Sequence, residues 1–205
     1  KHITTGEGGA ISTNNPDLAA KLKTLRSHGI TKDSSYFIDN ELSFDNESNS
    51  TNLWYYEMQE LGFNYRLPDI LCSLGSAQLS RVNFFIEKRR EIAEYYRKNL
   101  KELEFVTLPY IENENVLASY HLFPLQIDFS AIKKTRNQVM KELKSLNIGT
   151  QVHYIPIPWQ PYYKKNQDKF LSTSLDNASK FYFSELSIPM YSSLMIEECD
   201  FVISK

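Results

Sequence analysis

The chain has 205 residues, of which 41% are hydrophobic, and its 23 basic and 25 acidic side chains leave a net charge of −2. This length can bury a sizeable core in one or two domains, and the near-neutral charge without a basic run disfavours nucleic-acid binding. We expect no membrane span and no signal peptide, and the two cysteines lack metal-ligand spacing. These features predict a cytoplasmic protein that binds no metal.

The first ten residues place a lysine just before a turn that contains three glycines. Lys1 is followed by His-Ile-Thr-Thr and then by Gly6, Gly8 and Gly9. Glycine allows backbone angles and close approaches that a Cβ prevents, and exposed N–H groups in such a turn can line an anionic ligand. A lysine amine can also form a Schiff base with a cofactor carbonyl. A short β-strand is expected at residues 10–13, after the turn.

The next elements are a helix and a polar surface loop. The helix is predicted from Pro16 to about Ser27, because Asn15 suits the N-cap position and proline suits the first helical turn. Gly29 is the predicted stop signal. Residues 33–52 are rich in Asp, Asn and Ser, a composition that indicates a surface loop.

An aromatic stretch then leads into the segment Gly-Phe-Asn-Tyr-Arg-Leu at residues 62–67. Asn64 and Arg66 are two residues apart, so in an extended segment their side chains point to the same side. A guanidinium at this position can meet a pyrophosphate through a bidentate contact. A structural ion pair is the alternative interpretation of Arg66.

Pro68 predicts the start of one long helix that reaches about Leu103, because apolar residues recur there with approximate helical spacing. The remainder of the chain is expected to alternate strands and helices. The expected strands are residues 105–108, 120–127 and 150–154, the expected helices are residues 136–146, 178–186 and 196 onward, and residues 187–191 are expected to be a short edge segment.

Three segments together resemble the DegT/DnrJ/EryC1/StrS family of sugar aminotransferases, which depend on pyridoxal 5'-phosphate (PLP). They are KHITTGEGGAISTN at the start, GFNYRL at residues 62–67 and QVHYIPI at residues 151–157. The resemblance covers nearly the whole chain and implies an α/β fold, the C-terminal part of a fold-type I PLP-dependent transferase. Residues 1–78 would then end the PLP-binding large domain, and residues 79–205 would form a small α+β domain. The N-terminal half of such an enzyme is expected to lie outside this sequence.

The resemblance also implies a role for several residues. Lys1 would hold PLP and then move protons as a free amine. Asn64 would cross a dimer interface and contact the PLP phosphate of the partner subunit. His153 and Tyr154 would lie near the sugar of the substrate, and Arg66 would bind its pyrophosphate. A packing role is the alternative for His153, and His121 is expected to be structural.

The activity implied by the resemblance is transfer of an amino group from glutamate to C4 of a UDP-linked 4-keto-6-deoxy-N-acetylhexosamine, for surface-glycan or nonulosonic acid biosynthesis. The enzyme would be a homodimer with shared active sites, and the 205-residue chain alone would be inactive. Two alternatives stay open. One is a non-catalytic or dehydratase-type member of the family, in which the lysine is usually replaced. The other is a module for sugar-nucleotide binding or dimerisation.

Overall fold

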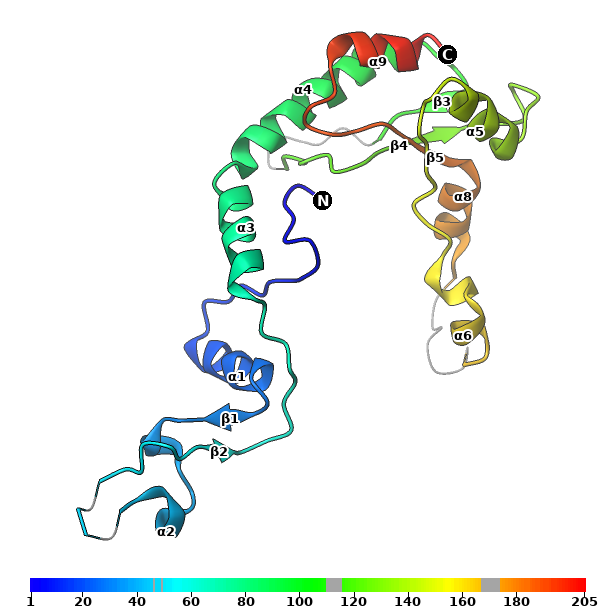
Figure 1. Cartoon of the computed structure of the whole chain (residues 1–205). Helices are drawn as coiled ribbons and strands as arrows, with labels where there is room; N and C mark the ends of the chain where they lie inside the picture. Colours follow the sequence, from blue (N-terminus) through cyan, green and yellow to red (C-terminus); the bar gives the residue numbers. More distant parts are fainter. Residues whose placement is uncertain (46, 49, 110–115, 167–173) are drawn as a thin grey trace. The chain divides into compact units, whose positions relative to one another are not determined.

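A computed structural model describes residues 1–45, 47–48, 50–109, 116–166 and 174–205 of the chain (Figure 1). The chain divides into two compact units. One unit is Ile3–Leu79, and the other is Ser80–Lys205 together with Lys1–His2. The assignment of residues 1–78 to a large domain and of residues 79–205 to a small one stays a prediction.

The Ile3–Leu79 unit consists of short helices and a small antiparallel sheet. Its elements are α1 (Pro16–Arg26), β1 (Ile30–Thr31), the 3-10 helix η1 (Ser34–Tyr36), α2 (Asn40–Ser43), β2 (Glu57–Met58) and α3 (Asp69–Leu79). Helix α1 begins where it was predicted, because the side chain of Asn15 accepts hydrogen bonds from the backbone N–H groups of Asp17 and Leu18. Strands β1 and β2 pair antiparallel, with Ile30 opposite Met58.

Two glycines bring the end of α1 into direct backbone contact with the segment that follows β2. Gly29 has φ +71°, and a Cβ added to it would lie 1.8 Å from the carbonyl oxygen of Glu60. A Cβ on Gly62 would lie 2.0 Å from the backbone nitrogen of Gly29. The N–H of His28 also donates to the carbonyl of Phe63 at 2.9 Å. Only glycine fits at this contact, since any other side chain would force the two backbones apart.

Residues 33–52 are largely exposed, as expected of a surface loop, but that expectation missed two short helices, η1 and α2, within them. Asp39 caps α2 by accepting from the N–H groups of Glu41 and Leu42. The carboxylate of Glu57, on β2, accepts from the N–H groups at positions 38 and 39. Local Asx capping and one distant carboxylate therefore order this polar segment. Residues 46 and 49 of it lie outside the described residues.

Two further expectations in this part of the chain were wrong. Residues 10–13 form no strand with any described segment. The predicted long helix is two helices, α3 and α4, separated by a turn at Ser80 and Arg81. Arg81 has φ −105° and ψ 2°, so the backbone leaves the helical region there. The hydrogen bonds of the second helix begin where the carbonyl of Arg81 accepts from the N–H of Phe85. No glycine or proline marks this break in the sequence.

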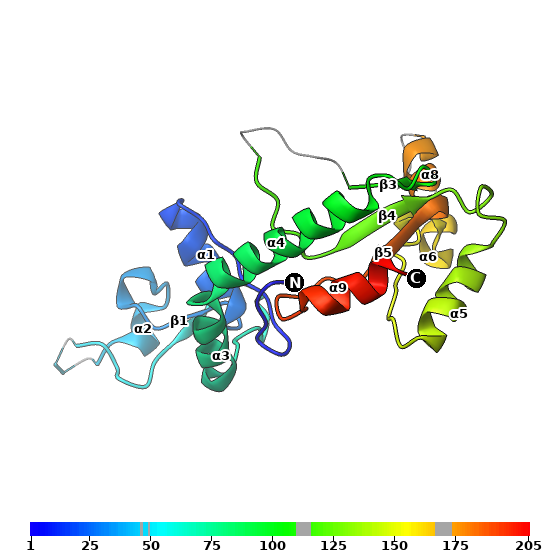
Figure 2. The same cartoon turned by 90° about the horizontal axis from the view of Figure 1, so that it is seen from above.

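The Ser80–Lys205 unit is built on a three-stranded antiparallel sheet of order β3-β4-β5. Its elements are α4 (Val82–Leu100), β3 (Val106–Thr107), β4 (Phe123–Ile127), α5 (Arg136–Ser145), η2 (Ile157–Trp159), α6 (Pro161–Lys164), α8 (Asp176–Ser184), β5 (Glu185–Ile188) and α9 (Ile196–Ile203). Figure 2 shows the same elements in a second view.

One face of this sheet carries the hydrophobic core. Phe123 and Leu125 of β4 lie opposite Ile188 and Leu186 of β5, and all four are buried. Helices α4 and α9, which lie side by side (Figure 1), cover this face. The core side chains outside the sheet are Ile92, Ala93, Tyr96, Leu100, Met190, Leu194 and Cys199. The residues between the apolar ones in β5 have the opposite orientation, so Glu185 and Ser187 face away from this core.

Two expectations near the C-terminus were wrong. The helix expected to end at 186 ends at Ser184, and the next two residues already belong to β5. The first two residues of the expected edge segment belong to β5, which is the outermost strand in the order β3-β4-β5 and whose four residues are all buried. The strand expected at residues 150–154 is reduced to a single bridge between Gln151 and Ser187. In both places tertiary pairing, and not local propensity, decides the secondary structure.

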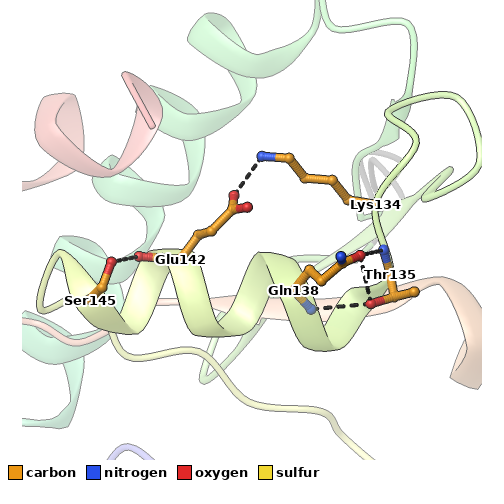
Figure 3. Close-up of polar contacts among 5 residues, drawn as sticks. All are labelled: Lys134, Thr135, Gln138, Glu142 and Ser145. Atoms are coloured by element: carbon orange, nitrogen blue, oxygen red, sulfur yellow. Dashed lines mark hydrogen bonds and ion pairs between the residues drawn. The ribbon is translucent and has the colours of Figure 1, made fainter.

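Helix α5 lies close to its predicted bounds and has a complete N-terminal capping box (Figure 3). The hydroxyl of Thr135 accepts from the N–H of Gln138 at 3.2 Å, and the side chain of Gln138 accepts from the N–H of Thr135 at 2.8 Å. Lys134, which precedes the helix, and Glu142 within it form an exposed ion pair at 2.5 Å. Two otherwise unpaired backbone donors are thus satisfied, which fixes the start of α5.

Candidate active site

The lysine at the start of the chain is tied to the Ser80–Lys205 unit through its neighbour. Nε2 of His2 lies 2.8 Å from the hydroxyl of Ser119. The ring of His2 also meets that of His121 edge-on, with centroids 6.3 Å apart and planes at 80°. The side chain of Lys1 is exposed. These contacts hold the backbone of Lys1 beside residues 119–121 and leave its amine accessible.

Two of the histidines beside this lysine lie among positive charges. Partial burial lowers the pKa of His121, and the charges of Lys1, Arg89 and His153 act in the same direction. Burial also lowers the pKa of His2, with a further contribution from the guanidinium of Arg89. Both imidazoles are therefore held neutral near neutral pH, a form that can accept a proton.

The Arg89 guanidinium, on α4, fixes the segment that carries His121. It is buried, and its Nη1 donates to the carbonyl oxygens of Tyr120 at 3.1 Å, His121 at 3.2 Å and Met190 at 2.8 Å. Burial lowers the pKa of Arg89 as well. A buried cation that binds three backbone carbonyls orders the chain just before β4 and just after β5, and this order sets the position of the His121 ring.

The His153 side chain is held by two buried polar residues of β5. Its Nδ1 lies 2.9 Å from the hydroxyl of Ser187, and its backbone N–H donates to Oε2 of Glu185 at 2.8 Å. The Ser187 hydroxyl donates in turn to Oε1 of Glu185 at 2.6 Å. Tyr154 meets the His153 ring edge-on at 4.6 Å and is 68% exposed. This chain of contacts orients the imidazole from the non-core face of the sheet.

The glycine turn belongs to the Ile3–Leu79 unit and needs glycine for steric reasons. Gly6 has φ +78° and Gly8 has φ +158°. A Cβ added at Gly8 would lie 2.6 Å from the hydroxyl oxygen of Thr5 and 3.2 Å from a methyl carbon of Leu67. The turn therefore packs closely against Leu67, two residues before α3, and substitution of Gly8 would displace it.

Asn64 and Arg66 lie on an extended segment of the same unit. The N–H of Tyr65 donates to the carbonyl of Arg26 at 3.0 Å, and Asn64 bridges to Ser27. The rings of Phe63 and Tyr65 stack on one side of this segment, with their centroids 4.8 Å apart. Because side chains alternate along an extended segment, the side chain of Asn64 points to the other side. Both Asn64 and Arg66 are exposed, and neither side chain has an ion pair or hydrogen bond with another described residue.

The structure thus places Lys1, His153 and Tyr154 in one unit and Asn64 and Arg66 in the other. The roles given to these five residues stay predictions. Sequence reasoning missed the polar partners, which are His2, Ser119, Glu185 and Ser187. The alternation Glu-x-Ser at 185–187 was the available signal for the β5 pair, but Glu185 was assigned to the end of a helix and Ser187 to the edge segment after it.

Neither a metal site nor a membrane span is found in the part of the chain that the structure describes. It holds no group of three or more His, Cys, Asp or Glu side chains that could bind a metal ion. None of the described helices combines the length and the apolar character needed to cross a bilayer.

Comparison with known proteins identifies relatives along the whole sequence. The chain is 38% identical over 191 residues to the uncharacterised protein MJ1066 of Methanocaldococcus jannaschii, covering 93% of this chain and 46% of that protein. It is 36% identical over 202 residues to the UDP-4-amino-4,6-dideoxy-N-acetyl-beta-L-altrosamine transaminase of Campylobacter jejuni, covering 98% of this chain and 48% of the relative. The chain therefore spans about half the length of these relatives.

A solved structure supports the same relationship. Helicobacter pylori PseC, an aminotransferase involved in the biosynthesis of pseudoaminic acid, matches with a TM-score of 0.79 and 30% identity. The match covers 100% of this chain and 49% of PseC. The expected fold, a C-terminal portion of this aminotransferase fold, is confirmed by this likeness. Residues 1–205 match the DegT/DnrJ/EryC1/StrS aminotransferase family over their full length, and the chain belongs to that family.

Proposed function

We propose that the whole protein containing this chain is a PLP-dependent aminotransferase. It transfers an amino group from glutamate to C4 of a UDP-linked 4-keto-6-deoxy-N-acetylhexosamine, in the biosynthesis of surface glycans or nonulosonic acids. The observation that carries the proposal is the position of Lys1 beside residues 119–121, which the contacts of His2 with Ser119 and with the ring of His121 fix. The similarity to the Campylobacter jejuni transaminase and to Helicobacter pylori PseC supports the sugar class.

The residues of this chain suit PLP. Lys1 offers an exposed primary amine, and the turn after it has the positive φ angles of Gly6 and Gly8. Asn64 offers an exposed side-chain amide without a described partner, and an amide N–H suits a phosphate oxygen. PLP, when bound, supplies the electron sink for the substrate carbon, and the protein supplies binding and orientation.

In this proposal Lys1 first binds the cofactor through its amine and later acts as a free amine that moves a proton at the substrate carbon. Acid–base work of this kind contributes about 10²–10⁴-fold to a rate. Arg66 binds the pyrophosphate of the nucleotide sugar through its guanidinium. His153 and Tyr154 contact the sugar itself.

The proposal includes a homodimer in which Asn64 serves the partner subunit's site. Large apolar side chains of the Ile3–Leu79 unit are exposed in this chain, as expected of a surface that another subunit covers. Lys1→Ala and Asn64→Ala subunits should each have little activity. Mixed dimers should regain activity, since one of their two sites then has both residues. No recovery in dimers that are shown to have mixed would contradict the sharing of sites.

The function is tested with the whole protein and two substrates. Purified protein should show the absorbance of bound PLP, lose it on addition of glutamate, and aminate the UDP-linked keto sugar but not a dTDP-linked one. Amination of only the dTDP sugar would refute the UDP assignment. A protein without bound PLP would refute the aminotransferase and favour a sugar-nucleotide-binding module.

We also propose that the 205-residue chain alone lacks transaminase activity and binds PLP poorly. The acidic partner for the pyridine nitrogen and the ring-stacking residue would have to come from outside it. A PLP titration of the isolated chain tests this. Stoichiometric binding with turnover of glutamate would contradict it.

A further inference from the structure

We propose that Glu185 and Ser187 form a relay that fixes the tautomer of His153, so that this ring accepts a hydrogen bond from a hydroxyl of the sugar. The inference rests on the proposed function for the identity of the ligand. The tautomer assignment itself rests only on the hydrogen bonds among Glu185, Ser187 and His153 and not on any activity.

The relay begins at a carboxylate that the sheet has buried completely. Glu185 is the first residue of β5 and is 0% exposed, although its side chain lies on the face opposite the hydrophobic core. Its two oxygens both act as acceptors. Oε2 accepts from the backbone N–H of His153 at 2.8 Å, and Oε1 accepts from the hydroxyl of Ser187 at 2.6 Å. Two short hydrogen bonds thus satisfy a buried group that would otherwise destabilise the fold.

The single hydrogen of the Ser187 hydroxyl then determines which nitrogen of the His153 ring carries a hydrogen. A serine hydroxyl has one hydrogen, and here that hydrogen is used on Glu185. The contact of 2.9 Å between the Ser187 hydroxyl and Nδ1 of His153 must therefore have the ring nitrogen as donor. In the neutral imidazole this leaves Nε2 without a hydrogen and with a free lone pair.

The remaining nitrogen is available for a ligand. Nε2 of His153 has no hydrogen-bond partner among the described residues, and the ring is only half-buried. A lone pair fixed in this way selects a donor, so the matching group on a sugar is a hydroxyl and not a carbonyl oxygen. Glu185 and Ser187 act through His153 and are positioning residues, while His153 touches the substrate.

A single isosteric change should reverse the relay. In Glu185→Gln the N–H of His153 still needs an acceptor, so the new amide turns its oxygen toward it and its NH₂ toward Ser187. The Ser187 hydroxyl then accepts from that NH₂ and donates its own hydrogen to Nδ1. The ring consequently carries its hydrogen on Nε2 and presents a donor where the sugar hydroxyl needs an acceptor.

The test uses whole protein labelled with [15N]histidine, at a pH at which the ring is neutral. Long-range 1H–15N spectra distinguish the two tautomers, and His153→Gln identifies the signals that belong to this ring. We expect the hydrogen on Nδ1 in the unmodified protein, on Nε2 in Glu185→Gln, and a mixture in Ser187→Ala. Ser184→Ala is the control, because this hydroxyl donates to the backbone of α8 and not to the relay. A hydrogen on Nε2 in the unmodified protein would overturn the proposal.

Kinetic measurements test the sugar contact of His153 separately from the transaminase activity as a whole. With the UDP-linked 4-keto-6-deoxy-N-acetylhexosamine, Glu185→Gln should raise KM about tenfold, the loss of one hydrogen bond. The half-reaction with glutamate should not change, because no sugar is present. An equal loss in both half-reactions would indicate a merely structural role and overturn the sugar contact. If the protein aminated no sugar while the spectra showed the hydrogen on Nδ1, the proposed function would fail and the tautomer assignment would stand.

Discussion

The two units differ in how much of their apolar surface they bury. In the Ser80–Lys205 unit, side chains from α4, β4, β5 and α9 form one buried cluster. Among the described residues of the Ile3–Leu79 unit, no large apolar side chain is buried, and Leu53, Leu61 and Trp54 are 98%, 83% and 75% exposed. Hydrophobic burial within the Ser80–Lys205 unit stabilises that unit. The Ile3–Leu79 unit is stabilised by backbone contacts and helix caps, and its apolar surface is suited to contact with other protein.

The largest effect on stability is expected at the centre of the buried cluster. Phe123 is 0% exposed and packs against Tyr96, with ring centroids 5.2 Å apart. Phe123→Ala should lower the free energy of unfolding by about 3–5 kcal/mol. Leu53→Ala is the contrasting variant from the other unit and should change it by less than about 0.5 kcal/mol. Chemical denaturation of both variants measures this, and equal losses would break the comparison between the units.

The second effect concerns the backbone contact in the unit without a core. Gly29→Ala should lower the free energy of unfolding by about 2 kcal/mol or more, because φ is +71° and the new Cβ would collide with the Glu60 carbonyl. Gly149→Ala is the matched control, since nothing lies within 4 Å of a Cβ there. Hydrogen exchange at the amides of β1 and β2 localises the change. Unaltered protection of these strands in Gly29→Ala would show that the glycine contact does not hold this unit together.

A smaller effect is expected where capping, and not burial, stabilises the Ser80–Lys205 unit. Thr135→Ala removes the hydroxyl that accepts from Gln138 at the start of α5 (Figure 3). It should cost about 1 kcal/mol of unfolding free energy. Ser145→Ala removes only a hydroxyl that donates to the carbonyl of Glu142 within the same helix and should have almost no effect. A thermal melt compares the two, and equal shifts would argue against the capping box.

The smallest effect is expected at the exposed ion pair between Lys134, just before α5, and Glu142 within it. Lys134 and Glu142 are 46% and 55% exposed, so solvent screens their attraction. A double-mutant cycle with Lys134→Met and Glu142→Gln should give a coupling of about 0.5 kcal/mol or less, and it should shrink at high salt. A coupling energy as large as the loss of unfolding free energy in Thr135→Ala would contradict this expectation. It would show that a screened surface ion pair stabilises this unit as much as a helix cap does.

Local signals predicted the elements that local interactions define. Asn15 and Pro16 marked the start of α1, and the capping sequence at Thr135 fits the start of α5. The first two residues of β5 were assigned to the end of a helix, because only pairing with β4 decides their state. The turn at Ser80 was missed because neither glycine nor proline produces it.

The candidate site shows the same division. Lys1 and His153 stand in short motifs, so the sequence alone named them. Their partners come from distant segments: Ser119 meets His2, and Glu185 and Ser187 meet His153. Sequence spacing carries no information about such contacts, because antiparallel pairing and a buried core bring these residues together.

One measurement tests the central claim most directly. The whole protein is incubated with PLP, reduced with borohydride, digested, and analysed by mass spectrometry to find the lysine that carries the reduced cofactor. We expect the modification at Lys1, and no modification in Lys1→Ala. Modification of another lysine, with Lys1 free, would contradict the account.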